Sequence, residues 1–264
     1  MILNPFGICL LAVVPLRANP LHASEMISQL IFGDTFEIIE QQDSWIKIKT
    51  NYDDYEAWVD EKQIADIDQI IVKKLSLETQ FLTKNPATLI LKGKQKEGMY
   101  LPSGSVLPFL QGEEFLINNE TYQVKPNDVF LPDLRNFHSQ IAQTAKSFLN
   151  APYLWGGKTH FGIDCSGFSQ TVFKLLGIKL KRDAYQQAEQ GQTVDFLVEA
   201  KAGDLAFFDN EEGRITHVGI MLSNSEIIHA SGKVKIDRID NQGIFAGDQN
   251  KYTHKLRIVK RMLN

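Results

Sequence analysis

The sequence lacks a disulfide framework, a strong charge of one sign and a long hydrophobic run. Its 264 residues include two cysteines, Cys9 and Cys165, so we expect no disulfide framework and a free thiol at Cys165. The net charge of −4, from 28 basic and 32 acidic residues, supplies no positive field for nucleic acid or anionic lipid. The apolar stretch at residues 8–14 is too short to cross a membrane, which takes about 20 residues.

The position of this apolar stretch bears on where the protein acts. A secretory signal carries basic residues before its apolar part, whereas Arg17 is the first basic residue here. We therefore interpret residues 8–14 as the first strand of the folded chain and expect a cytoplasmic protein. A periplasmic or secreted location is the alternative if residues 1–14 are the remnant of a signal.

Hydrophobic periodicity divides the chain into three predicted domains. Short apolar runs separated by turns predict one small β-barrel at residues 1–68. A second set of runs, with an apparent hairpin turn at Asn118 and Asn119, predicts another barrel at residues 69–131. A third domain, residues 132–264, begins where apolar residues first recur at helical spacing: Phe137, Ile141, Ala145 and Phe148.

The third domain changes from helices to strands along the chain. One predicted helix carries Phe168, Val172, Leu175 and Leu176 on a single apolar face and is closed by Gly177. From residue 203 onward, strand-like runs follow one another without a further helix. Helices followed by strands within one unit predict an α+β domain with an antiparallel sheet.

Cys165 is the candidate nucleophile of this domain. It stands at the start of the predicted helix, where unsatisfied backbone N–H groups and the helix dipole favour a thiolate. A catalytic cysteine also needs a base and a group that orients the base. His217 opens one predicted strand and His229 ends the next, so a hairpin between the two strands brings the two rings side by side.

Other interpretations of these residues remain open at this stage. A lone cysteine on a helix is often a small buried apolar residue, and a lone histidine at a strand end is often only hydrogen-bonded. Cys165, His217, His229 and Asp164 include the residue types that bind zinc. They lack the paired spacing that zinc sites have, and the sequence predicts no metal and no cofactor.

Four motifs in the third domain resemble those of the NlpC family of bacterial cell-wall peptidases. They cover most of residues 137–260 and follow the family order. Residues 152–157 and 162–168 resemble the nucleophile signature, which includes Cys165. The family's other three motifs are matched by residues 203–208, 217–220 and 228–230.

The resemblance implies a papain-like fold, a catalytic triad and a substrate groove. Cys165, His217 and His229 match the triad, and Tyr153 matches a tyrosine whose hydroxyl helps to receive the oxyanion. The remaining matches line the groove in the family: Trp155, Asp164 and Ser166. Four histidines fall outside the motifs and receive no role: His22, His138, His160 and His254.

The two barrels resemble bacterial SH3 domains, as in γ-D-glutamyl-L-diamino-acid endopeptidases that process free muropeptides. In that subgroup, two acids and a tyrosine hold the free amine of an N-terminal L-Ala. Glu25, Tyr55 and Asp183 are the candidates for this clamp, because paired carboxylates around an ammonium select substrates with a free end.

The sequence thus predicts a cysteine endopeptidase for the γ-D-glutamyl–diamino acid bond of peptidoglycan stem peptides. Its expected partners are peptides such as L-Ala-γ-D-Glu-diamino acid, with neither nucleic acid nor membrane. One alternative is a peptidoglycan-binding module without hydrolysis. A second alternative is an amidase or acyltransferase that uses the same thiol.

Overall fold

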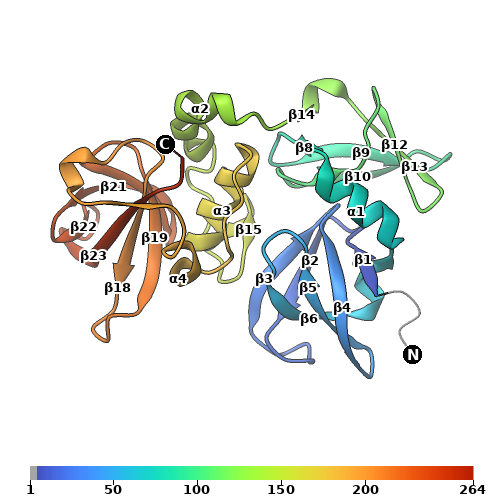
Figure 1. The fold of residues 1–264 in the computed structure, drawn as a ribbon, viewed down its shortest axis with the longest axis horizontal. Helices are drawn as coiled ribbons and strands as arrows, with labels where there is room; N and C mark the ends of the chain where they lie inside the picture. The colour runs from blue at the N-terminus through green and yellow to red at the C-terminus, as the bar shows by residue number, and fades with distance from the viewer. Residues whose placement is uncertain (1–4, 264) are drawn as a thin grey trace. The chain divides into compact units, whose positions relative to one another are not determined.

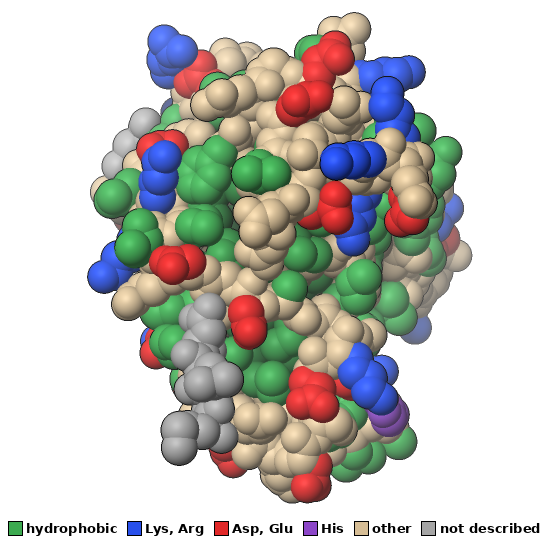
Figure 2. Space-filling model, turned by 90° about the vertical axis from the view of Figure 1, so that its right-hand side faces the viewer, with side chains coloured by type: hydrophobic (Ala, Val, Ile, Leu, Met, Phe, Trp, Pro, Cys, Tyr) green, Lys and Arg blue, Asp and Glu red, His purple; other side chains and the backbone are tan. Residues whose placement is uncertain are grey.

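The computed structural model describes residues 5–263 and divides into two compact units, with the boundary along the chain between Pro132 and Asp133 (Figure 1). Each unit is described by itself. Within the described residues, no helix is long and apolar enough to cross a membrane. Acidic and basic side chains are interspersed on the face that Figure 2 displays, as expected from a net charge of −4.

The first unit begins with a strongly bent antiparallel sheet. Its strand order is β3-β2-β6-β5-β4-β1-β7. Buried and exposed side chains alternate along β4, where Phe36 and Ile38 point into the core while Glu37 and Ile39 point outward. The strands are β1 (Phe6–Ile8), β2 (Val13–Arg17), β3 (Met26–Ile31), β4 (Thr35–Gln42), β5 (Trp45–Thr50), β6 (Glu56–Asp60) and β7 (Ala65–Asp66).

The rest of the first unit consists of one helix and two small sheets, with orders β10-β9-β13-β12 and β11-β8-β14. The predicted hairpin is confirmed, since β12 and β13 pair across Asn118 and Asn119, whose φ angles of 49° and 63° suit a tight turn. The elements are α1 (Gln69–Leu77), β8 (Phe81–Thr83), β9 (Thr88–Lys92), β10 (Glu97–Leu101), β11 (Val106–Leu107), β12 (Glu114–Ile117), β13 (Glu120–Val124) and β14 (Val129–Phe130).

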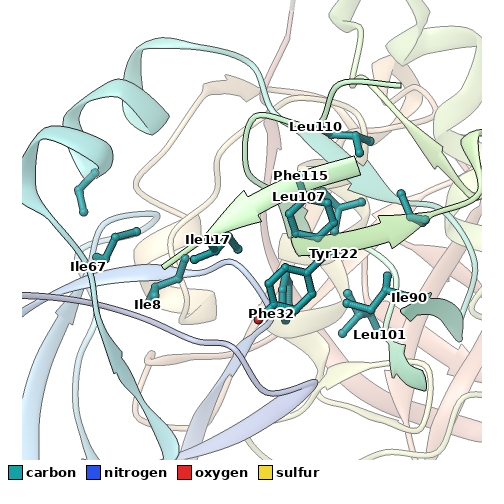
Figure 3. Close-up of a cluster of buried hydrophobic side chains, with 12 residues drawn as sticks. Ile8, Phe32, Ile67, Ile90, Leu101, Leu107, Leu110, Phe115, Ile117 and Tyr122 are labelled. Carbon is teal, nitrogen blue, oxygen red and sulfur yellow. The ribbon is translucent and has the colours of Figure 1, made fainter. Parts of the chain in front are cut away.

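A shared hydrophobic core joins these two parts of the first unit (Figure 3). Ile8 on β1 and Phe32 after β3 belong to the same buried cluster as Phe115 and Tyr122 on β12 and β13. The Phe32 ring meets the Tyr122 ring edge-on at 5.5 Å, and Phe115 stacks on Tyr122 at 5.0 Å. The division into one barrel domain at residues 1–68 and a second at residues 69–131 stays a prediction, because residues from both segments fill one core.

The second unit contains helices followed by an antiparallel sheet, as the sequence predicts. The sheet order is β17-β23-β18-β19-β20-β21-β22, and β22 also pairs with β23, so the last six strands close into a barrel. Its helices are α2 (Phe137–Lys146), α3 (Cys165–Leu175) and α4 (Ala184–Gln187). Its strands are β15 (Lys158–Thr159), β16 (Gly162–Ile163), β17 (Gln192–Val194), β18 (Leu205–Asp209), β19 (Ile215–Met221), β20 (Glu226–Ser231), β21 (Lys233–Asp240), β22 (Gly243–Ala246) and β23 (Lys251–Arg261).

Helix α3 is the element that positions the candidate nucleophile. It begins after Asp164, whose side chain accepts a hydrogen bond from the backbone N–H of Gly167 at 2.6 Å, as an N-cap does. Gly177, with a φ of 84°, follows its C-terminal end. The predicted apolar face is buried, but the rest of the helix is buried as well, since all eleven residues of α3 are buried. The polar ones hydrogen-bond internally, as Ser169 does to Gln187 at 2.7 Å.

The shared core of the first unit predicts a large effect of Phe32→Ala. Removing a fully buried ring leaves a cavity, so we expect the free energy of unfolding of this unit to fall by about 3–5 kcal/mol. Trp45 and Trp58 are buried in the same unit, and their fluorescence during urea unfolding measures it. Leu116→Ala, at a side chain 58% exposed on β12, is the control and should change the value by less than about 0.5 kcal/mol. Equal effects of the two substitutions would contradict the shared core.

Candidate active site

Cys165 is the first residue of α3 and lies against the strand that carries His217. Its sulfur accepts hydrogen bonds from the backbone N–H groups of Ser166 and of Val218 on β19. Val218 directly follows His217, so the thiol and the imidazole belong to the same corner of the domain. The side chain of Cys165 is only 6% exposed, and both cysteines of the chain are free thiols.

Burial keeps this thiol protonated in the free protein. Desolvation and then the negative charge of Asp164 raise the pKa of Cys165 to about 12. The two backbone donors and the Arg182 guanidinium act in the opposite direction and are outweighed. The sequence-based expectation of a resting thiolate is therefore wrong, because desolvation at this helix N-terminus exceeds the stabilisation that the N-terminus supplies. Deprotonation has to accompany the reaction.

His217 and His229 form a hydrogen-bonded pair inside the barrel. The pairing of β19 with β20 places Gly219 opposite His229, so His217 lies diagonally across from His229 on the same face. The Nε2 atom of His217 is 2.8 Å from the Nδ1 atom of His229. Gly219 makes room for this arrangement, since a Cβ atom there would lie 2.9 Å from the Cβ atom of His229. The structure thus brings the two predicted rings together.

The surroundings of His217 keep its imidazole neutral. Burial first, and then His229 and His254, lower the pKa of His217 well below its ordinary value. A neutral imidazole is the form that accepts a proton. His217 is therefore in the state that a general base requires.

His254, which received no role from the sequence, stacks on His217. The ring centroids are 4.1 Å apart, with 26° between the planes. The Nδ1 atom of His254 lies 2.9 Å from the Thr253 hydroxyl oxygen. Burial, with a smaller contribution from His229, lowers the pKa of His254 to about 4, so it adds no positive charge at neutral pH. No pattern in the sequence signals this contact, because it depends on how the barrel closes.

Tyr153 lies beside Cys165 and stays protonated. Burial, followed by the negative charges of Cys165 in its thiolate form and of Asp164, raises the pKa of Tyr153 above its ordinary value. The residue is half-buried, and its backbone bridges to Ile163 on β16. A protonated hydroxyl is a hydrogen-bond donor, the form that an oxyanion requires.

Asp164 and Ser166 belong to a buried network centred on Arg182. The guanidinium group of Arg182 is 1% exposed and binds both carboxylate oxygens of Asp164, at 3.1 and 2.6 Å. It also donates to the Ser166 hydroxyl at 2.9 Å. Asp164 further accepts from the backbone N–H of Gly156 at 2.8 Å. Arg182 was not among the predicted site residues, although it adjoins the predicted Asp183.

The remaining residues that were predicted to contact the substrate belong to both units. In the second unit, Trp155 is 58% exposed, and Asp183 is partly buried and caps the short helix α4 through its side chain. In the first unit, Glu25 is exposed and Tyr55 is half-buried against the barrel core. Within the described residues, no group of three or more His, Cys, Asp or Glu side chains could hold a metal ion.

Comparisons with known proteins identify the families to which parts of the chain are similar. Residues 150–253 match the NlpC/P60 family, and residues 16–64 match the bacterial dipeptidyl-peptidase SH3 domain. The second unit therefore contains the catalytic domain of a cysteine peptidase. The chain is a cysteine endopeptidase with an NlpC/P60 domain at residues 150–253 and an SH3 domain ahead of it.

Curated relatives of the chain match most of its length. The γ-D-glutamyl-L-lysine dipeptidyl-peptidase of Bacillus subtilis strain 168 is 29% identical over 217 residues, which cover 77% of this chain and 71% of the relative. Dipeptidyl-peptidase 6 of Lysinibacillus sphaericus is 25% identical over 252 residues, which cover 86% of this chain and 89% of the relative.

Solved structures share the fold. The crystal structure of an NlpC/P60 family protein from Bacillus cereus is 20% identical and superposes with a TM-score of 0.82, covering 98% of this chain and all of the other. An NlpC/P60 endopeptidase from Photobacterium damselae is 18% identical, with a TM-score of 0.72 and coverage of 97% of this chain and 70% of the other. The SH3 match ends at residue 64, so an SH3-like barrel at residues 69–131 stays a prediction.

The raised pKa of Cys165 predicts slow alkylation of the folded protein. At pH 8, iodoacetamide should modify Cys165 at least about tenfold more slowly than in the urea-unfolded chain, because the thiolate reacts and an unfolded cysteine has a pKa of about 8.5. The rate in the folded protein should still be rising at pH 10. Peptide mass spectrometry separates Cys165 from Cys9. A fast rate that is flat between pH 6 and 8 would reveal a resting thiolate and contradict the account.

The buried ion pair predicts that Arg182→Lys destabilises the second unit by about 3 kcal/mol. Lysine cannot make the paired hydrogen bonds to Asp164, and the carboxylate is left incompletely paired in the interior. Calorimetric unfolding measures the loss. Arg135→Lys is the matched control, because Arg135 makes the same kind of pair with Asp133 at the surface. The unfolding temperature of Arg135→Lys should equal that of the wild-type protein. A decrease equal to that of Arg182→Lys would refute the role of burial.

Proposed function

We propose that this peptidase hydrolyses the γ-D-glutamyl–diamino acid bond of L-Ala-γ-D-Glu-diamino acid peptides. Two observations support the proposal. Relatives that cover most of the chain are named γ-D-glutamyl-L-lysine dipeptidyl-peptidases. The sulfur of Cys165 also accepts a hydrogen bond from Val218 on β19, the residue after His217, and His217 in turn pairs with His229 on β20; this geometry carries the chemistry.

In the proposed reaction, the Cys165 sulfur attacks the γ-carbonyl carbon of D-Glu while His217 takes the thiol proton. Coupling the two events avoids a free thiolate, which burial disfavours. The carbonyl oxygen becomes an oxyanion, and the Tyr153 hydroxyl donates a hydrogen bond to it. His217 then gives its proton to the nitrogen of the diamino acid, the C–N bond breaks, and a thioester remains on Cys165.

Water completes the cycle. It attacks the thioester carbon as His217 accepts one of its protons, the C–S bond breaks, and the sulfur recovers a proton from His217. L-Ala-D-Glu leaves with the added oxygen. An α-helix that presents its nucleophile to an antiparallel sheet carrying the base is the arrangement of papain-like enzymes, and we propose that kinship for the second unit.

We further propose that the enzyme acts on free peptides in the cytoplasm during cell-wall turnover. The candidates for amine recognition are Glu25, Tyr55 and Asp183, which supply two carboxylates and a hydroxyl. The carboxylate of Asp183 accepts from a backbone N–H at the start of α4, which fixes its direction while leaving it only partly buried. A neutral N-terminus offers such a clamp no charge, so acylated peptides should be poor substrates.

The decisive assay uses the free tripeptide L-Ala-γ-D-Glu-L-Lys and its meso-diaminopimelate counterpart. The wild-type protein should release L-Ala-D-Glu, whereas Cys165→Ala should lose all detectable activity, with products followed by mass spectrometry. Cys9→Ala is the matched control and should retain full activity. Intact tripeptides after incubation with the wild-type protein would refute the proposed substrate.

The clamp is tested with the N-acetylated tripeptide. Acetylation should lower kcat/KM by about 10²-fold or more, because it removes the ammonium charge that the carboxylates would bind. Glu25→Gln and Asp183→Asn should each reduce the ratio of kcat/KM for the free tripeptide to kcat/KM for the acetylated tripeptide. Equal cleavage of free and acetylated peptides by the wild-type protein would remove the clamp from the account and leave the peptidase assignment intact.

A further inference from the structure

Asp237 is a buried carboxylate that directly contacts the second histidine of the site. It lies on β21, where the register with β20 places it opposite Ile227 and diagonally across from His229 on the same face. One carboxylate oxygen, Oδ2, is 3.0 Å from the Nε2 atom of His229. The side chains of Asp237 and His229 are 8% and 1% exposed, so water does not compete for this contact.

The charged neighbours of Asp237 keep its carboxylate ionised. Burial alone would raise the pKa of Asp237, but hydrogen bonds from His229 and Lys235 outweigh it and bring the pKa below its ordinary value. The Nζ atom of Lys235 is 3.2 Å from Asp237 and 3.1 Å from Asp248, so its charge is shared between two carboxylates. The ionised carboxylate of Asp237 is therefore a hydrogen-bond acceptor for His229.

An ionised carboxylate accepts hydrogen bonds and donates none, which fixes the protons along the chain. The Nε2 atom of His229 must carry the proton that it shares with Asp237. When His229 is neutral, its Nδ1 atom is an acceptor, and the Nε2 atom of His217, 2.8 Å away, is then the donor. The remaining nitrogen of His217, Nδ1, is left with a lone pair.

We propose that Asp237 is a positioning residue of the active site, which through His229 sets the tautomer of His217 and makes Nδ1 the atom that takes the thiol proton. Asp237 touches neither thiol nor substrate, and it acts through the two imidazoles. Its negative charge also stabilises the positive charge that the imidazole pair gains when the thiol proton arrives. The proposal rests on the roles assigned above to Cys165 and His217.

The tautomers can be observed without substrate. In wild-type protein labelled with ¹⁵N-histidine, long-range ¹H–¹⁵N spectra at pH 8 should show both His217 and His229 protonated at Nε2. Variants His217→Gln and His229→Gln assign the two signals. Protonation of His217 at Nδ1 would overturn the proposal whether or not the tripeptide is cleaved, so this measurement separates it from the proposed function.

Kinetics of Asp237→Asn test the effect on the reaction. We expect kcat for the tripeptide to fall by about 10²-fold with KM changed by less than about threefold, since substrate binding is untouched. The acid limb of the kcat/KM profile reports protonation of the imidazole pair. That limb should move to lower pH, because loss of the negative charge makes the pair harder to protonate.

Asp248→Asn is the matched control. It removes the same charge from the other side of Lys235, where Asp248 is exposed and touches no imidazole. Its kcat should stay within twofold of the wild-type value and its acid limb should not move. Asp237→Asn with kcat within threefold and an unmoved acid limb would contradict the proposal. Equal losses in both variants would do the same, because they would reflect net charge rather than the contact with His229.

Discussion

The hydrogen bond between His217 and His229 is the interaction on which the site depends. It exists because two antiparallel strands pair in one register and because Gly219 has no side chain to hold them apart. A shift of the register by one residue would turn His229 to the opposite face of the sheet. The barrel that encloses the pair is thus part of the chemistry, since its closure holds the register and excludes water from both rings.

Burial sets the protonation states that the reaction starts from. The same desolvation raises the pKa of Cys165 and lowers the pKa of His217, so both groups are neutral at rest. A neutral pair is less open to adventitious oxidation or alkylation than a thiolate, since the thiolate is the reactive form. In the proposed reaction, charge appears only when the substrate is attacked: the positive charge forms on the imidazole pair, and the Tyr153 hydroxyl donates a hydrogen bond to the negative charge.

The sequence predicts the local parts of this site well and the long-range parts poorly. Cys165 follows from a helix start, and the meeting of His217 with His229 follows from a hairpin, because both depend on neighbouring segments. His254 and Arg182 could not be foreseen, since their contacts require the closure of the barrel and the packing of a loop against α3. The hydrophobic pattern also does not predict the full burial of α3, because its polar residues hydrogen-bond to partners elsewhere in the fold. The shared core around Phe32 likewise joins segments about 80 residues or more apart.

The central claim is that the sulfur of Cys165 becomes covalently bound to the acyl part of the substrate. Rapid acid quenching of wild-type protein with the tripeptide, followed by peptide mass spectrometry, tests it most directly. The account predicts a thioester of L-Ala-D-Glu on the peptide that contains Cys165, which disappears as substrate is exhausted and never forms in His217→Ala. Product formation without any adduct in early quenches, or an adduct on another residue, would contradict it.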